Sequence, residues 1–276
     1  MFYPYDGDYS MSIFGITEEK LKKIEYLFDG WNETLIWSCL QGYMGTAWAE
    51  NDTNPRSAQI VIADFCFFAG EVNEALVKNK PKDYKSDFVI MVPQNEAWAK
   101  LIEKVYGKNA THVTRYAIKK EKDIFDIEKL KAIVKNVSAN YDIRFIDEEV
   151  YHMAMKDKWS KDLCSQFKNY EEYSKKGLGV AALYHGELVS GASSYTVYRG
   201  GIEIEIDTKA DYRRKGLAAA CGAKLILECV NRNLYPSWDA QNKWSVALAE
   251  KLGYHFEKEY VAYEVNGYEL GLFVKA

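Results

Sequence analysis

The sequence is poor in cysteine, histidine and proline, and it has no excess of basic residues. Its 276 residues include 5 cysteines, 4 histidines and 5 prolines, and the formal net charge is −4. The acidic balance argues against a general nucleic-acid binder, because that role needs a basic surface. The cysteines are odd in number, and neither they nor the histidines have metal-ligand spacing, which argues against a disulfide framework and a zinc site. We therefore expect a reduced, cytoplasmic protein without a bound metal.

Long apolar runs are absent as well. No stretch reaches the ~20 apolar residues that a helix needs to cross a bilayer, and the start, Met1 to Asp6, lacks the basic and apolar regions of a signal peptide. The chain instead spreads 48% hydrophobic residues along its length, which suffices for a substantial core. These features predict a globular protein with no membrane partner.

One segment of the C-terminal half combines a strand, a basic turn and a helix. Residues 202–206 alternate with the period of a strand, and from Leu217 the apolar residues repeat with the period of a helix. The turn between them contains Arg213, Arg214, Lys215 and Gly216. A helix N-terminus favours an anion, because its first N–H groups lack intrahelical acceptors and the helix dipole is positive there. On charge alone, a solvated surface turn is the simpler interpretation.

The order of residues in this turn resembles a known cofactor signature. Arg213-x-x-Gly216-x-Ala218 matches the [Gln/Arg]-x-x-Gly-x-[Gly/Ala] acyl-CoA motif of the GNAT superfamily of N-acetyltransferases. A signature this short is weak by itself. It gains weight from its place, because it follows a strand and opens a helix, as it does in that superfamily.

A second motif follows at a separation that is similar to that of the superfamily. Residues 235–240 read as a short strand, and the next helix begins at Asn242 and ends before Gly253. This resembles the GNAT region in which a helix begins with Asn beside the pantetheine arm. The wider segment 191–263 is similar to the GNAT branch that contains the zwittermicin A N-acetyltransferase, an antibiotic self-resistance enzyme.

This resemblance implies an activity and a set of cofactor residues. The expected reaction transfers the acetyl group of acetyl-CoA, a co-substrate, to a primary amine of a small molecule such as an aminopolyol or an aminoglycoside-like antibiotic. The positions that match the cofactor region are Ile206, Asp207, Thr208, Arg213, Arg214, Lys215, Gly216, Leu217, Ala218, Ala219, Asn242 and Ser245. A backbone N–H near Asp207 or Thr208 is expected to serve the thioester oxyanion.

Acetyl transfer to an amine also needs a base. A free alkylamine has a pKa of about 10 and is mostly charged at neutral pH, so a carboxylate must take its proton. Glu203 and Glu205 share one face of the strand that the resemblance places beside the thioester. We expect Glu205 to be the closer base and Glu203 the second. The alternative is an exposed sheet face with ordinary solvated acids.

The general acid is where the sequence departs from the superfamily. Many members place Tyr where this chain has Ala249. Tyr254 and Ser245 are candidates by proximity, and a thiolate with an intrinsic pKa of about 8.5 can also leave and be protonated by water. Cys221 and Cys229 fall on the apolar stripe of their helix, which favours direct transfer over an acyl-cysteine intermediate.

The chain also repeats a pattern. Gln94-Asn95-x5-Leu101-x-Glu103-Lys104 matches Gln241-Asn242-x5-Leu248-x-Glu250-Lys251 at identical spacing. Shared residue types in two strand–helix–strand units explain this in one way, and a tandem pair of GNAT-like halves explains it in another. The predicted fold is α/β (α+β): a mixed, mostly antiparallel central sheet flanked by helices, in two GNAT-like halves of which the first is degenerate.

The predicted boundary lies in the charged connection before a helix at 127–134. It separates a degenerate GNAT-like domain, 1–125, from a catalytic acetyl-CoA-binding GNAT domain, 126–276. The first domain is expected not to bind acyl-CoA, because its strand-like segment 57–70 leads into Gly-Glu-Val-Asn rather than a basic turn. Core completion, part of the acceptor pocket and homodimer formation remain open for it. Two rival functions are a tandem-GNAT aminoacyl transferase that uses charged tRNA and a non-catalytic acyl-CoA-binding module.

Overall fold

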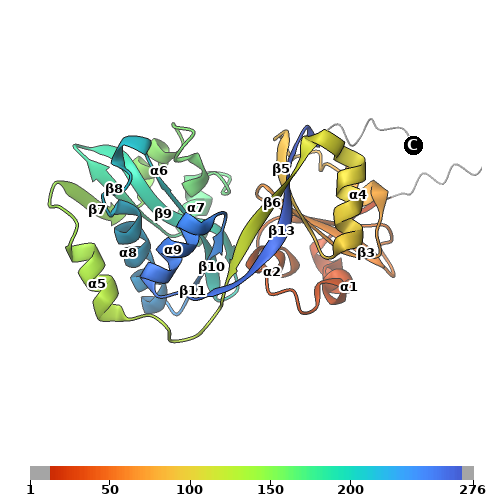
Figure 1. Ribbon diagram of the computed structural model, residues 1–276, viewed down its shortest axis with the longest axis horizontal. Helices are drawn as coiled ribbons and strands as arrows, with labels where there is room; N and C mark the ends of the chain where they lie inside the picture. Colours follow the sequence, from red (N-terminus) through yellow and green to blue (C-terminus); the bar gives the residue numbers. More distant parts are fainter. Residues whose placement is uncertain (1–12, 269–276) are drawn as a thin grey trace, which may run out of the picture. The chain divides into compact units, whose positions relative to one another are not determined.

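The computed structural model describes residues 13–268, which divide into two compact units (Figure 1). Unit 1 contains the described residues up to 113 and again from 261, and unit 2 contains 114–260. Two strands are therefore shared between the units, β6 (Ala110–Ile118) and β13 (Phe256–Asn266). The sequence predicts one boundary near residue 125, whereas the units separate at 113/114 and at 260/261, because β13 returns to unit 1. The roles assigned to the two domains stay predictions.

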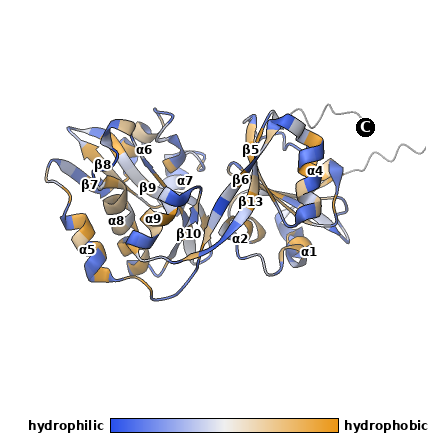
Figure 2. Ribbon diagram, in the orientation of Figure 1, coloured by the Kyte–Doolittle hydropathy of each residue, from blue (hydrophilic) through white to orange (hydrophobic). Residues whose placement is uncertain are grey.

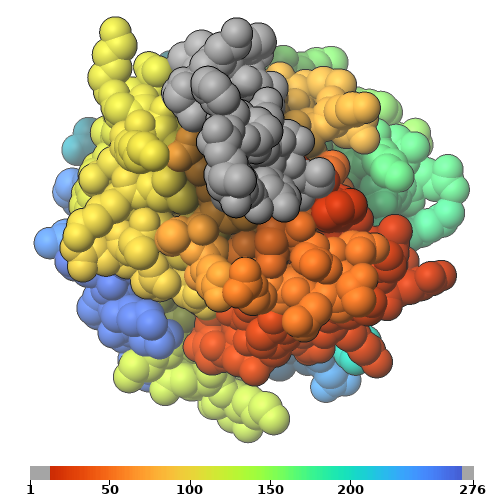
Figure 3. Space-filling model, turned by 90° about the vertical axis from the view of Figure 1, so that its right-hand side faces the viewer, coloured from red at the N-terminus to blue at the C-terminus, as the bar shows by residue number. Residues whose placement is uncertain are grey.

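Unit 1 is built on a mostly antiparallel sheet. Its strands follow the order β1-β2-β3-β4-β5-β13, and the one parallel neighbour pair in that order is β4 with β5. The elements are β1 (Phe14–Ile16), η1 (Glu18–Lys20), α1 (Lys22–Glu25), η2 (Tyr26–Phe28), α2 (Thr34–Leu40), β2 (Thr46–Ala49), β3 (Ser57–Ile62), β4 (Phe65–Gly70), α3 (Glu74–Lys78), β5 (Phe88–Pro93), α4 (Glu96–Tyr106) and η3 (Gly107–Asn109). Phe68, Met91 and Trp98 pack in its core. Residues from β1 to α4, red to yellow, make most of the face in Figure 3.

Unit 2 is built on a second sheet, in the order β11-β10-β9-β8-β7. Its neighbours are antiparallel except for β10 with β11, and β12 pairs separately with β6. The elements are α5 (Ile127–Lys135), β7 (Tyr141–Phe145), α6 (Glu148–Ala154), η4 (Lys161–Leu163), α7 (Tyr170–Lys176), β8 (Gly179–Tyr184), β9 (Glu187–Tyr198), β10 (Gly201–Thr208), η5 (Ala210–Tyr212), α8 (Leu217–Asn231), β11 (Tyr235–Ser237), β12 (Asp239–Ala240) and α9 (Lys243–Leu252). The fold class is the predicted one.

Side-chain caps explain where most helices of unit 2 begin. Asp126, Asp147, Asn169 and Asn242 each accept a backbone N–H from the first turn of α5, α6, α7 and α9 respectively. The exception is α8, which begins after Gly216 and has no side-chain cap. Hydrophilic residues, blue in Figure 2, lie along α4 and α5, whereas most residues of α8 are buried.

Around the predicted cofactor turn, the strand over 202–206 and the helices that begin at Leu217 and after Asn242 are confirmed. The strand predicted over 235–240 is instead divided into β11 and β12, which pair with β10 and β6 respectively. A hairpin joins β8, which ends at Tyr184, to β9, which begins at Glu187, and His185 and Gly186 in its turn both have positive φ. Residues 161–175 do not form one helix: η4 and α7 are separate, because Asn169 caps a new helix start. The strand-like segment 57–70 is a hairpin of β3 and β4 that reverses at residues 63–64.

Candidate functional site

The strand β10 presents different residues to its two faces. A Cβ placed on Gly222 of α8 would lie 3.1 Å from the Ile206 side chain, so Ile206 faces α8. Gly191, the register partner of Asp207, would point a Cβ at Leu163 of η4. Side chains alternate along a strand, so Glu205 and Asp207 share the face that η4 covers.

The parallel strands β10 and β11 separate after a short paired stretch. They pair from Gly201 with Tyr235 to Glu203 with Ser237, and β12 then pairs with β6, through Asp239 with Ala117. Among the described residues, no strand pairs with 204–208 on the side that β11 leaves. The pairing of β10 with its other neighbour, β9, shifts register at the same level, between Glu203 and Ile204 of β10. The open edge of β10 can accept an extended ligand by backbone hydrogen bonds, as an added strand would.

The open edge leads to the N-terminus of α8. Gly216 caps this helix with φ +82° and ψ 0°, a left-handed conformation, and Arg214 is also left-handed with φ +59°. No side chain caps the first turn and no acidic residue lies in it. Arg213, Arg214, Lys215 and Gly216 are all exposed, and the Lys215 ammonium lies 4.7 Å from the Tyr212 ring centroid. Uncapped N–H groups with three cations form a site suited to a phosphate.

Acidic groups line the η4 face of β10. Glu205 and Asp207 are half-buried. Burial raises the pKa of Asp207 above its usual range and Asp162 of η4 adds to this, while the Thr208 N–H and Arg213 oppose it. The Thr208 N–H donates to Asp207 Oδ1 at 2.6 Å, so one of the two backbone groups expected to serve the oxyanion is already engaged. This face attracts a cation.

Glu203 lies deeper than Glu205. It is 4% exposed, and its charge raises the pKa of the neighbouring phenols of Tyr198, Tyr235 and Tyr254 after the larger effect of burial. Its register partner Thr196 has a buried hydroxyl with no hydrogen-bond partner among the described residues. Glu203 therefore belongs to a buried polar cluster at the root of the strand separation, and Glu205 is the more accessible of the two predicted bases.

Tyr254 occupies a position that does not suit a general acid. It is buried, and its hydroxyl donates to the Pro236 carbonyl oxygen at 2.6 Å. Burial raises its pKa well above the usual value, with smaller contributions from Tyr235 and other neighbours. A buried phenol that donates its proton to a backbone carbonyl is poorly placed to give that proton to a leaving thiolate. We therefore leave Tyr254 out of the proposed chemistry.

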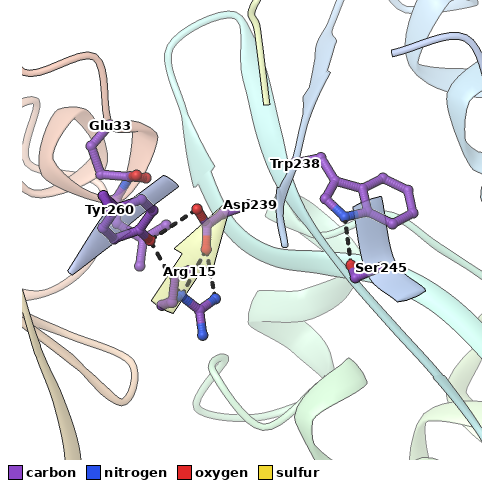
Figure 4. A network of polar contacts seen from close by, with 7 residues as sticks. Glu33, Arg115, Trp238, Asp239, Ser245 and Tyr260 are labelled. Atoms are coloured by element: carbon purple, nitrogen blue, oxygen red, sulfur yellow. Dashed lines mark hydrogen bonds and ion pairs between the residues drawn. The ribbon is translucent and has the colours of Figure 1, made fainter. Parts of the chain in front are cut away.

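The predicted second cofactor motif forms the start of α9. Asn242 Oδ1 accepts from the Ser245 N–H at 2.9 Å. Ser245 Oγ accepts from Trp238 Nε1 at 3.0 Å (Figure 4). Trp238 follows β11 directly, so this hydrogen bond ties the first turn of α9 to the strand that diverges from β10. Trp244 in the same turn is 87% exposed.

The cysteines are unsuited to covalent catalysis. Cys221 and Cys229 are fully buried on α8, and burial raises the pKa of each to about 12. At neutral pH these thiols are protonated and shielded from a thioester. The structure thus agrees with the expected position of both residues on the apolar stripe.

Other features of the molecule lie away from this site. A hollow of about 400 Å³, lined by residues such as Lys129, Glu250 and His255, lies at the opposite end of α9 from Asn242. Within residues 13–268 there is no cluster of three metal-ligating side chains. The described helices include none with the length and apolar character needed to cross a bilayer.

Comparison with known proteins decides the family. The family model described as GNAT acetyltransferase matches residues 25–263. The chain belongs to this family. This GNAT protein is 43% identical to a GCN5-related N-acetyltransferase-like protein from Streptococcus suis, whose crystal structure matches with a TM-score of 0.85 over 90% of this chain and 99% of that one. It is 24% identical over 261 residues to the uncharacterized N-acetyltransferase YdfB of Bacillus subtilis strain 168, which covers 90% of this chain and 97% of YdfB.

More distant structures share the fold. A tandem GNAT protein from the clavulanic acid biosynthesis pathway, 10% identical, has a TM-score of 0.54 over 93% of this chain and 99% of its own. The GNAT protein described here is therefore an acyltransferase enzyme with the fold of its family, whose members use acetyl-CoA as co-substrate.

Sequence reasoning missed three residues beside the site, Arg115, Asp239 and Tyr260. Arg115 Nη2 lies 2.6 Å from Asp239 Oδ1, and the Tyr260 hydroxyl donates to Asp239 Oδ2 at 2.9 Å. The carboxylate on a short strand was visible in the sequence, but nothing local points to a partner that precedes it by 124 positions.

Proposed function

We propose that the protein transfers the acetyl group of acetyl-CoA to a primary amine of a small, polar molecule by direct transfer. The observation that carries the proposal is the separation of β10 from β11 after Glu203, which places Glu205 on an open strand edge leading to the uncapped start of α8. Arg213, Arg214 and Lys215 would hold the pyrophosphate with the first N–H groups of α8. The 204–208 edge would hold the pantetheine arm.

The chemistry assigns one step to each group. Glu205 takes the ammonium proton, and the amine lone pair then attacks the thioester carbon. The C–S bond breaks, the attacking nitrogen releases its second proton to solvent, and the thiolate leaves and takes a proton from water to give CoA, since no side chain is retained as the acid. The product is an amide. The acidic face formed by Glu205, Asp207 and Asp162 attracts the cationic form of the acceptor before it loses its proton.

The acceptor class we favour is an aminopolyol or aminoglycoside-like antibiotic. Two observations support it: the acidic η4 face of β10, and the similarity of segment 191–263 to the GNAT branch of the zwittermicin A N-acetyltransferase. A polar, polycationic acceptor gains more from several carboxylates than an apolar amine does.

The test is a CoA-release assay with acetyl-CoA and a panel of aminopolyols, aminoglycosides, polyamines and amino acids. We expect release with at least one polar amine, loss of CoA binding in Gly216→Glu, and a fall in kcat of about 10²- to 10⁴-fold in Glu205→Gln with CoA affinity retained. Glu187→Gln, an exposed carboxylate on the neighbouring β9, is the matched control and should keep full activity. Ping-pong kinetics with an acylated cysteine, or full activity of Glu205→Gln, would overturn this mechanism.

A further inference from the structure

The two units contain the same parallel strand pair, followed by the same helix cap. Ile90 of β5 and Ser237 of β11 each lie five residues before the asparagine that caps the next helix, Asn95 or Asn242. Ile90 pairs with Phe65 of β4, and Ser237 pairs with Glu203 of β10. These pairs are therefore counterparts, and the strands can be compared residue by residue.

The pairs diverge two residues later. In unit 1 the parallel pairing continues through Phe67 with Val92 and on to Phe68 with Pro93. The counterparts of Phe67 and Val92 in unit 2 are Glu205 and Asp239, and these two do not pair. Had β12 stayed beside β10, two carboxylates would lie directly opposite on one face, which is unfavourable.

Asp239 does not pair with β10 and instead lies in a charge cluster with Arg115 and Tyr260 (Figure 4). Arg115 of β6 donates to Asp239 Oδ1 from Nη2 at 2.6 Å and from Nε at 2.9 Å, and the Tyr260 hydroxyl donates to Oδ2 at 2.9 Å. The side chains of Arg115 and Asp239 are each only 11% exposed. Burial lowers the pKa of Arg115, but Asp239 and Tyr260 together raise it by more, so Arg115 stays charged.

This cluster lies where β12 leaves β10. Asp239 and Ala240 pair with Ala117 and Tyr116 of β6, so the backbone and the charged side chains favour the same partner strand. Removal of one charge would leave the other buried without its counter-charge. The cluster therefore resists any return of β12 to the edge of β10.

We propose that Arg115, Asp239 and Tyr260 are positioning residues that hold β12 away from β10 and so keep the acyl-CoA edge open. The role in CoA binding rests on the proposed function, whereas the role in strand separation does not. None of the three residues needs to touch the cofactor. Their effect passes through the position of β12 and of Trp238, which precedes it and binds Ser245.

The decisive variant replaces the ion pair by apolar residues. Arg115→Met/Asp239→Val gives β12 the residue that unit 1 has at Val92 and removes both charges of the pair together. Buried ion pairs are often replaced this way without loss of stability. We expect a melting temperature close to that of the wild type, slower amide hydrogen exchange over residues 204–208 in the ligand-free protein, and CoA affinity reduced at least about tenfold.

The matched control is Arg144→Met/Glu149→Val, which removes an exposed Arg–carboxylate pair of the same unit at 2.7 Å. It should change neither the exchange at 204–208 nor CoA affinity. Unchanged hydrogen exchange at 204–208 in the Arg115→Met/Asp239→Val protein would overturn the whole proposal. Slower exchange with unchanged CoA affinity would overturn only the part that concerns cofactor binding. If the wild type failed to bind CoA, the proposed function would be wrong, and the exchange result would still decide whether the cluster separates the strands.

A second variant keeps the test valid if the double variant fails to fold. Tyr260→Phe removes the hydrogen bond that the hydroxyl donates to Asp239 and the one that it accepts from Arg115 Nε at 3.2 Å, and it keeps both charges. We expect a CoA affinity about two- to threefold lower, a small effect for the loss of these hydrogen bonds. CoA affinity equal to that of the wild type in a folded Tyr260→Phe protein would contradict a positioning role for Tyr260.

Discussion

The region β4–α3–β5–α4 of unit 1 and the region β10–α8–β11–α9 of unit 2 share a plan but differ at each point where a cofactor would bind. Both have a parallel strand pair and a second helix capped by asparagine. The helix between the paired strands is 15 residues long in unit 2 and 5 in unit 1. A cofactor site therefore depends on what surrounds the shared plan, since the plan itself is present twice.

The turn after the first strand shows the difference most directly. In unit 1 the Gly70 N–H donates to Gln94 Oε1 at 2.9 Å, and its carbonyl oxygen accepts from Trp98 Nε1 at 2.9 Å. Asn73 also caps α3 with its own side chain. In unit 2 the turn at Gly216 lacks such a cap. Side chains of unit 1 thus satisfy the backbone groups that an anion would bind in unit 2.

The side chains on the first strand of each pair, β4 in unit 1 and β10 in unit 2, differ in the same way. Phe65 and Phe67, the counterparts of Glu203 and Glu205, are buried with ring centroids 5.9 Å apart. Packed aromatic rings contribute to a core and cannot accept a proton. Unit 1 thus has packed aromatic rings at the positions where unit 2 has the two acids, which favours core completion over cofactor binding as the role of these positions.

The largest expected effects come from substitutions at Trp98 and Ser245, which each lie three residues after the capping asparagine of their helix. Trp98 is fully buried and stacks on Phe68, so Trp98→Ala should lower the free energy of unfolding by about 3–5 kcal/mol. Ser245→Trp should instead weaken CoA binding at least about tenfold, because a bulky ring would fill the space beside β11. Urea unfolding and calorimetric titration with CoA measure the two effects.

The control for this comparison is Ser245→Ala, which removes only the hydrogen bond to Trp238 and should cost about 1 kcal/mol of stability. The contrast between the units would break if folded Trp98→Ala protein lost CoA affinity as strongly as Ser245→Trp. It would also break if Ser245→Trp bound CoA like the wild type.

More of the fold and of the cofactor turn could be predicted from the sequence than of the contacts around the proposed catalytic residues. Alternation in β10, the glycine at 216 and the capping asparagines are local signals, so the elements around the turn could be predicted from neighbouring residues. The hydroxyl of Tyr254 bonds a carbonyl 18 positions away, and Arg115 bonds a carboxylate 124 positions away. Such long-range partners depend on strand order, which no local pattern shows.

The next largest expected effect is a difference in stability between alanine variants of two glycines that have the same backbone conformation. Gly70 has φ +83° and Gly216 has φ +82°. A Cβ on Gly70 would collide with the Arg56 carbonyl oxygen, whereas nothing lies within 4 Å of a Cβ on Gly216. Gly216→Ala should therefore cost only the left-handed strain, about 1 kcal/mol, and Gly70→Ala clearly more.

Their effects on the cofactor should be reversed. We expect Gly216→Ala to weaken CoA binding, because the added methyl group stands where the phosphate approaches the first N–H groups of α8. Folded Gly70→Ala should bind CoA like the wild type. Thermal unfolding and CoA titration of both variants check the pair, and weaker CoA binding in Gly70→Ala alone would assign the cofactor to unit 1 instead.

The smallest effect is a pH dependence confined to unit 2. Burial raises the pKa of Asp207 in the folded protein, so its ionisation costs stability as the pH rises from the unfolded value of about 3.9 through the folded value. Asp207→Asn should therefore raise Tm at pH 7 by about 2 °C and give no gain at pH 3, where the carboxyl is protonated in both states. Asp211→Asn, an exposed carboxylate on the adjoining η5, is the control. An equal gain at both pH values would show that packing, and not the charge held on the η4 face, distinguishes this strand from its counterpart β4.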